Sequence, residues 1–141
     1  MKDATPAPLA FLMLGAVHEM EAQLEGALGQ AGLSLAKFGV LSKLAEAGEP
    51  LALGCLADRC SCVRSNMTQL VDRLEADKLV ERVDDPNDRR SIKAALTSEG
   101  RSRYEDGVRL LDEAERGVFA RLADPERDTL ARLLQTLRKN A

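Results

Sequence analysis

The sequence predicts an α+β fold that is mostly helical, with about six helices and one two-stranded β-hairpin. Apolar residues recur at three- and four-residue steps over most of the chain, which is the period of an amphipathic helix. The period changes once, where two short β-compatible runs, 79–83 and 91–96, flank a stretch rich in turn formers and charges, 84–90. The 141 residues suffice for one hydrophobic core, so we expect a single domain.

The composition indicates a globular protein with an aliphatic core. Hydrophobic residues make up 45% of the chain, charged residues 30% and aromatic residues only 3%, which does not suit a disordered chain. No uncharged run approaches the roughly 20 residues of a membrane span. The apolar stretch 9–17 leads into Glu19 and Glu21 without a small-residue cleavage site. We therefore expect a cytoplasmic protein without a signal peptide.

The formal net charge of −3 does not by itself indicate a nucleic-acid partner. Its distribution is uneven, because residues 1–50 carry three basic and six acidic side chains, whereas residues 56–103 carry ten basic and nine acidic ones. A local basic face on an acidic protein is sufficient for DNA binding. The total charge therefore leaves this class of function open.

Four helices are expected before the hairpin. The first carries an apolar stripe over residues 9–28, and Ser34 and Gly48 can cap the start and the end of the second. The third is short, at about 53–59, and the fourth ends near 77–78. After the hairpin, a helix capped by Thr97 and a last helix with Asp124 as N-cap complete the set. The last two helices carry apolar stripes at Leu111, Ala114, Val118 and Leu122, and at Leu130, Leu133, Leu134 and Leu137.

Residues 56–74 have the features of a helix-turn-helix. Ala57 is small enough for two helices to pack closely, and Ser61 is compact enough for the turn between them. The second helix buries an apolar face made of Met67, Leu70, Val71 and Leu74. Its other face carries Arg64, Ser65, Asn66, Thr68, Gln69 and Arg73. Because Arg, Asn and Gln can bond purine edges bidentately, this face predicts base reading in a major groove; a merely solvated polar face is the alternative.

The hairpin carries the sequence DPNDRRS at residues 85–91, followed by LTSEG at residues 96–100. These two motifs resemble the wing signature of the MarR family of transcriptional regulators. Residues 70–80, LVDRLEADKLV, resemble the end of its recognition helix. The resemblance covers residues 33–100 by motifs and the outer helices by arrangement only. It implies a winged helix-turn-helix that regulates transcription.

The resemblance also implies roles for three wing residues. Arg90 would reach the minor groove, Asp88 would orient the wing tip, and Arg89 would lie near a phosphate. An arginine is attracted by the negative potential of a narrow minor groove, so this assignment is physically reasonable. One departure from the family is Val63, which stands where Ser or Thr often caps the recognition helix. Valine cannot cap, so Ser61 or a backbone adjustment must satisfy the free amides.

In this family the outer helices pair across a two-fold axis. The implied organisation of residues 1–141 is a single domain in which residues 1–32 and 104–141 dimerise and residues 33–103 form the DNA-binding lobe. The apolar stripes at both ends of the chain suit this interpretation, since neither could be buried within so thin a monomer. The homodimer would bind a pseudo-palindromic operator in double-stranded DNA, most simply as a repressor released by a small-molecule effector.

Members of the family commonly bind small aromatic acids in a cleft between the dimerisation helices and the lobe. Aromatic and imidazole side chains that could line such a cleft here are Phe11, His18, Phe38, Tyr104 and Phe119. Isolated aromatic residues at helical spacing also suit an ordinary core. The sequence names no effector, and we expect no cofactor.

Three cysteines, Cys55, Cys60 and Cys62, lie within eight residues. The simpler interpretation is that they pack as small hydrophobic side chains. The alternative is a regulator of the same fold that senses oxidant or a soft metal through a thiol switch beside the recognition helix. No CxxC pair completes a tetrahedral zinc site, and His18 is the only histidine, so a zinc centre is not expected.

Two other classes of function are less well supported by the sequence. With one histidine, no Walker-type glycine-rich loop and no GxSxG motif, nothing indicates an enzyme. A winged helix that makes only protein contacts is the second alternative, but such a wing would not need the arginines at its tip.

Overall fold

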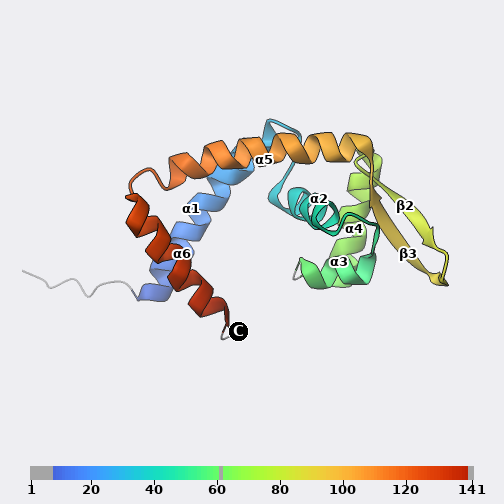
Figure 1. Ribbon diagram of the computed structural model, residues 1–141, viewed down its shortest axis with the longest axis horizontal. Helices are drawn as coiled ribbons and strands as arrows, with labels where there is room; N and C mark the ends of the chain where they lie inside the picture. Colours follow the sequence, from blue (N-terminus) through green and yellow to red (C-terminus); the bar gives the residue numbers. More distant parts are fainter. Residues whose placement is uncertain (1–7, 61, 140–141) are drawn as a thin grey trace, which may run out of the picture.

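The computed structural model describes residues 8–60 and 62–139, which form six helices and three strands. In chain order these are α1 (Leu9–Gly29), α2 (Leu35–Ala47), β1 (Leu51–Ala52), α3 (Leu53–Arg59), α4 (Arg64–Ala76), β2 (Val80–Asp85), β3 (Asp88–Leu96), α5 (Ser98–Val118) and α6 (Asp124–Lys139). Helices α2, α3 and α4 gather with the hairpin at one end, α1 and α6 lie at the other end, and α5 spans the two (Figure 1). The prediction of a mostly helical α+β fold is confirmed.

The sheet has three strands rather than the two that we expected. Its order is β1-β3-β2, and all pairings are antiparallel. The extra strand β1 comprises two residues, with Leu51 opposite Ala94 and Ala52 opposite Lys93. A two-residue strand has no periodicity of its own, so the sequence could not reveal it. It attaches the start of α3 to the sheet.

The hairpin is longer and its tip is shorter than expected, because β2 and β3 extend into the charged stretch 84–90. The side chain of Asp85 accepts a hydrogen bond from the Asn87 amide (2.9 Å), and that of Asp88 accepts one from the Arg90 amide (2.9 Å). The aspartates thus satisfy the backbone of the turn themselves. Pairing shifts from Asp84 opposite Ile92 to Asp85 opposite Asp88, so residues 89–91 form an irregular stretch of β3.

The helix ends follow the capping residues with one exception. Ser34 accepts a hydrogen bond from the Lys37 amide (3.1 Å), Gly48 has the left-handed φ of 67°, and Thr97 accepts from the Gly100 amide (2.9 Å). The exception is Asp124, which lies inside the first turn of α6 rather than at its N-cap. There the Ala123 amide donates to the Glu126 carboxylate (2.9 Å), so a later glutamate does the capping.

The hydrophobic core lies among α2, α3, α4 and the sheet. Its buried members are Leu28, Leu33, Val40, Leu41, Leu44, Leu51, Leu56, Ala57, Met67, Val71, Leu74, Leu79, Val80 and Ala94. Only one of them, Leu28, comes from α1, and none comes from α6. Helix α5 joins this core at Gly100 and Gly107. The outer helices α1 and α6 therefore contribute little to this core.

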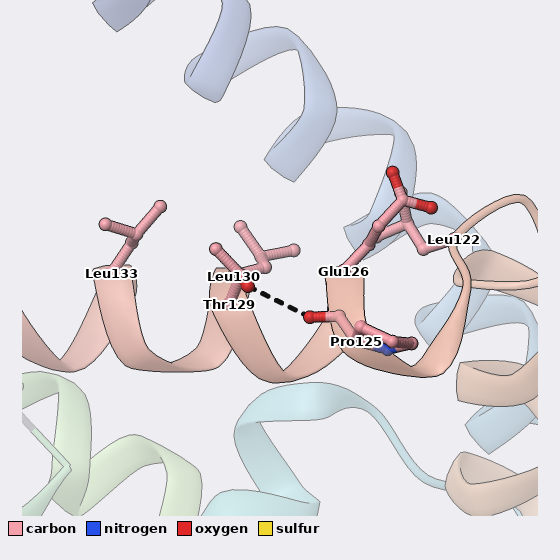
Figure 2. Close-up of a pocket in the computed structure, with 6 residues that line it drawn as sticks. All are labelled: Leu122, Pro125, Glu126, Thr129, Leu130 and Leu133. Carbon is pink, nitrogen blue, oxygen red and sulfur yellow. Dashed lines mark hydrogen bonds between the residues drawn. The ribbon is translucent and has the colours of Figure 1, made fainter.

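The outer helices leave large apolar side chains uncovered in the described chain. On α1, Leu9 is 73% exposed, and on α6, Leu137 is 56% exposed. An open groove of about 470 Å³ lies beside the start of α6. Figure 2 shows Leu122, Leu130 and Leu133, which line it, projecting to one side. The other exposed apolar residues of these helices are Phe11, Leu12, Met13, Leu14, Val17, Leu133 and Leu134. None of the described helices combines the length and apolar character needed to cross a membrane.

Candidate nucleic-acid interface

Helix α4 divides into a buried and an exposed face as its sequence predicts. Met67, Val71 and Leu74 are fully buried and Leu70 is half-buried. The exposed side chains include all six of the predicted base readers: Arg64, Ser65, Asn66, Thr68, Gln69 and Arg73. The Thr68 hydroxyl donates to the Arg64 carbonyl (3.1 Å), which holds its methyl group and oxygen in a fixed direction. The other five side chains are exposed and end in amide, guanidinium or hydroxyl groups.

Helix α4 begins without a side-chain cap. Val63 is the N-cap residue and makes no side-chain hydrogen bond, as its apolar side chain requires. The other predicted contributor, Ser61, lies outside the described residues.

A groove of about 420 Å³ brings the recognition helix and the wing together. Arg64 and Thr68 of α4 line one side, and Asp88 and Arg90 of β3 line the other. The floor comes from residues 52–54, at the start of α3. Two members of each predicted set thus border one groove. The other predicted DNA contacts do not line it: Ser65, Asn66, Gln69, Arg73 and Arg89.

A glycine makes room for the arginine in this groove. A Cβ atom built on Gly54 would overlap the guanidinium group of Arg64, so that group lies directly against the α3 backbone. This contact places the positive charge of Arg64 in the groove that the wing residues Asp88 and Arg90 also line. Sequence spacing alone gave no reason to select Gly54.

A cluster of charges that the sequence analysis missed connects the wing to α4. Arg82 of β2 donates to the carboxylates of Asp72 and Glu75, the latter at 2.9 Å, and its own amide donates to Glu75 at 3.1 Å. We call these three residues the Arg82 clamp. The hydrogen bond to Asp72, supplemented by Glu75, raises the pKa of the Arg82 guanidinium above its ordinary value. The clamp fixes the direction of the hairpin relative to the recognition helix.

The cysteines divide into a pair and a single residue. All three thiols are free and half-buried. Cys60 and Cys62 line a groove of about 410 Å³ with Lys43 and Arg59, whereas Cys55 is not among its lining residues. No group of three His, Cys, Asp or Glu residues in the described ranges is arranged to hold a metal ion, so the three thiols do not share one site. Burial raises the pKa of the Cys60 thiol; Lys43 opposes this rise in the pKa and Cys62 adds to it.

Two of the five residues suggested for an effector cleft, Phe38 and Tyr104, come together. The rings of Phe38 and Tyr104 stack with centroids 5.5 Å apart and an interplanar angle of 20°. A Cβ on Gly107 would lie 2.7 Å from the Phe38 ring, so α2 and α5 pack closely here. Phe11 and His18 are exposed on α1 and take no part in this stacked pair.

The comparisons with known proteins agree with this geometry. A profile of the MarR family matches residues 31–91. The chain is 33% identical over 107 residues to the transcriptional regulator FarR of Neisseria gonorrhoeae. The aligned region covers 74% of this chain and 73% of FarR. It is 31% identical over 121 residues to the transcriptional repressor YetL of Bacillus subtilis, or 85% of this chain and 70% of YetL.

Solved structures give the same result. A mutant of MarR from E. coli, complexed with operator DNA, has a TM-score of 0.84 and 25% identity over 92% of this chain and 93% of that one. A MarR-family regulator from Rhodococcus has a TM-score of 0.85 and 27% identity over 96% of each chain. Together with the helix-turn-helix and the wing, these matches show that the chain belongs to the MarR family of winged helix-turn-helix transcriptional regulators and is not an enzyme.

Proposed function

We propose that this protein is a repressor that binds a pseudo-palindromic operator as a homodimer and is released by a small-molecule effector. The main support is the groove in which Arg64 and Thr68 of α4 face Arg90 of the wing. In this proposal Asn66 and Gln69 read base edges in the major groove, and Arg90 enters the adjacent minor groove. The MarR mutant of similar fold is complexed with operator DNA, which supports an operator-binding function for this chain.

The dimer follows from the outer helices. We assign residues 33–103 to the DNA-binding lobe and residues 1–32 and 104–141 to dimerisation. The exposed apolar side chains of α1 and α6 support this division, because a second copy related by a two-fold axis would cover both stripes. Two lobes would then meet half-sites about one turn of DNA apart.

Selection of binding sequences from a random duplex library tests this function directly. We expect an inverted repeat, bound by two chains per duplex in sedimentation at near-physiological salt. Enrichment of no sequence, or of a single half-site bound by one chain, would contradict the proposal. A winged helix used only for protein contacts would give the first of these results.

The effector would act where the lobe meets the dimerisation helices. Phe38 of α2 and Tyr104 of α5 form a stacked pair at this junction, and a small aromatic acid inserted beside them would change the angle between α2 and α5. Such a ligand releases DNA only if it binds two conformations, which differ in the angle between α2 and α5, with different affinity. A screen of aromatic acids against the complex with the selected duplex, repeated with Tyr104→Ala, tests this assignment.

Loss of the wing arginine should weaken DNA binding without affecting the fold. The Arg90 side chain is exposed, so Arg90→Ala should leave the thermal midpoint unchanged. Affinity for the selected duplex should fall by about 1–3 kcal/mol. The control is Arg101→Ala, which removes an exposed arginine from α5, away from the groove. Equal affinity of the two variants in fluorescence anisotropy would rule out the minor-groove role.

Loss of the recognition-helix amides should reduce specificity. Asn66→Ala and Gln69→Ala should each lower the ratio of selected to random duplex affinity, by about 1–3 kcal/mol where a bidentate base contact is lost. Arg89→Ala is the matched control, because a phosphate contact should weaken both affinities alike. If the amide variants also lose both affinities in equal proportion, these side chains do not read bases.

A further inference from the structure

The groove that holds Cys60 and Cys62 lies on the opposite side of α4 from the predicted base readers. We call it the thiol groove. It is formed between α2 and the end of α3, and its apolar lining comes from Leu35, Ala36, Gly39, Met67 and Leu70. Lys43 and Arg59 are its cationic members. Nothing in DNA recognition requires two thiols in this place.

Cys60 and Cys62 both line the thiol groove. Burial raises the pKa of the Cys60 thiol, Lys43 opposes that rise, and Cys62 adds to it. The described residues place no third Cys, His, Asp or Glu with them as a possible ligand. Zinc in structural sites takes four ligands, so this pair does not suit it. Thiolates prefer soft cations such as Cu(I), and two sulfurs complete a linear site.

The charges around the groove favour a monovalent ion. A two-thiolate complex of a monovalent cation carries a net charge of −1. Lys43 and Arg59 can balance that charge, since Lys43 is only loosely paired with Glu46, at 3.7 Å. On binding, each thiol loses its proton to solvent as a sulfur–metal bond forms, and the oxidation state of the cation is unchanged.

We propose that Cys60 and Cys62 form a two-coordinate site for a soft monovalent cation of the Cu(I) class, placed in the thiol groove behind the recognition helix. Cys55 is not part of it. The site is additional to the DNA interface and can be tested without DNA.

The position of the two ligands connects this site to α4. The Cys60 amide donates to the Leu56 carbonyl at the end of α3 (2.9 Å), and the Cys62 amide donates to Ala57 (2.8 Å). Both ligands therefore belong to the turn that sets the angle between α3 and α4. Since closely packed helices absorb little movement, joining the two sulfurs through an ion should shift the start of α4. We expect operator affinity to fall about tenfold, a consequence that rests on the proposed function.

The first experiment titrates the reduced full-length protein with Ag(I), a redox-inert probe, in chloride-free buffer against a competing chelator. We expect one equivalent per chain and a raised thermal midpoint. Cys60→Ser and Cys62→Ser should each weaken binding by roughly 100-fold, because one of two soft ligands is lost. Cys55→Ser, the matched control, should bind as the wild type does. Undiminished binding by either of the first two variants, or a loss in the control, would overturn the site.

A second measurement uses the wild-type protein, so its result does not depend on whether the cysteine variants fold. Trypsin cleavage after Lys43, Arg59 and Arg64 places Cys55 in one peptide and the pair in another, 60–64. Bound Ag(I) should protect the 60–64 peptide from alkylation and leave Cys55 reactive. Equal protection of both peptides would contradict the proposal. Operator affinity is then measured with one equivalent of Ag(I), so that metal binding and DNA release are judged separately.

Discussion

Deletion of residues 124–141 is expected to yield insoluble or unfolded protein rather than a folded monomer. Helix α6 contributes nothing to the core of its own chain, so its loss would be tolerated if the protein acted as a monomer. In the proposed dimer, Leu130, Leu133 and Leu137 cover the stripes of the partner, and obligate dimers often have no stable folded monomer. Size-exclusion chromatography with light scattering and circular dichroism measures the outcome.

A point variant with a matched control tests the apolar stripe of α6 without shortening the chain. Leu137→Asp places a charge among exposed leucines and should dissociate or destabilise the dimer. Gln135→Ala changes an exposed polar residue of the same helix and should have little effect. A soluble, well-folded monomer from the deletion would contradict the expectation that the chain needs its partner in order to fold, whereas a folded dimer would show that the interface lies elsewhere.

The second large effect is expected at Gly100, where α5 meets the sheet. A Cβ atom there would overlap the Leu79 carbonyl oxygen and lie 2.9 Å from a methyl group of Leu96. That carbonyl cannot easily move, because it accepts hydrogen bonds from the Thr97 amide (3.1 Å) and hydroxyl (3.0 Å). Gly100→Ala should therefore lower the free energy of unfolding by about 3 kcal/mol.

Gly117→Ala is the control for this prediction. It lies in the same helix with no atom within 4 Å of its built Cβ, so the exchange should raise the free energy of unfolding by about 0.5–1 kcal/mol through helix propensity. Urea denaturation of both variants gives the comparison. If the two variants change the free energy of unfolding by the same amount and with the same sign, the close approach of Gly100 to Leu79 does not constrain α5.

Most of the fold follows from local signals that are repeated along each element. The buried face of α4 is readable because Met67, Val71 and Leu74 recur at helical spacing, and the exposed readers are what remains. Ser34 and Thr97 mark helix starts because their side chains bond amides only three residues away. Such short-range chemistry is contained in a few neighbouring letters of the sequence.

The features that escaped prediction depend on distant elements. Strand β1 exists only because Leu51 and Ala52 lie beside β3, more than 40 residues away. The Arg82 clamp depends on the register of β2 against α4, which no local pattern specifies. That Cys60 and Cys62 line one groove without Cys55 depends on how the residues after α3 pack against α2 and α4. Only folded coordinates supply such relations.

The Arg82 clamp also bears on how quickly the protein can find its site. A wing that hung freely from the lobe would have to be immobilised at each encounter with DNA, and that loss of conformational entropy would slow productive capture and weaken the complex. Here two carboxylates on α4 already hold the base of the hairpin through one guanidinium. In the proposed function the wing would therefore need little ordering when it meets DNA, and we expect diffusion, orientation and charge, rather than ordering of the wing, to limit association.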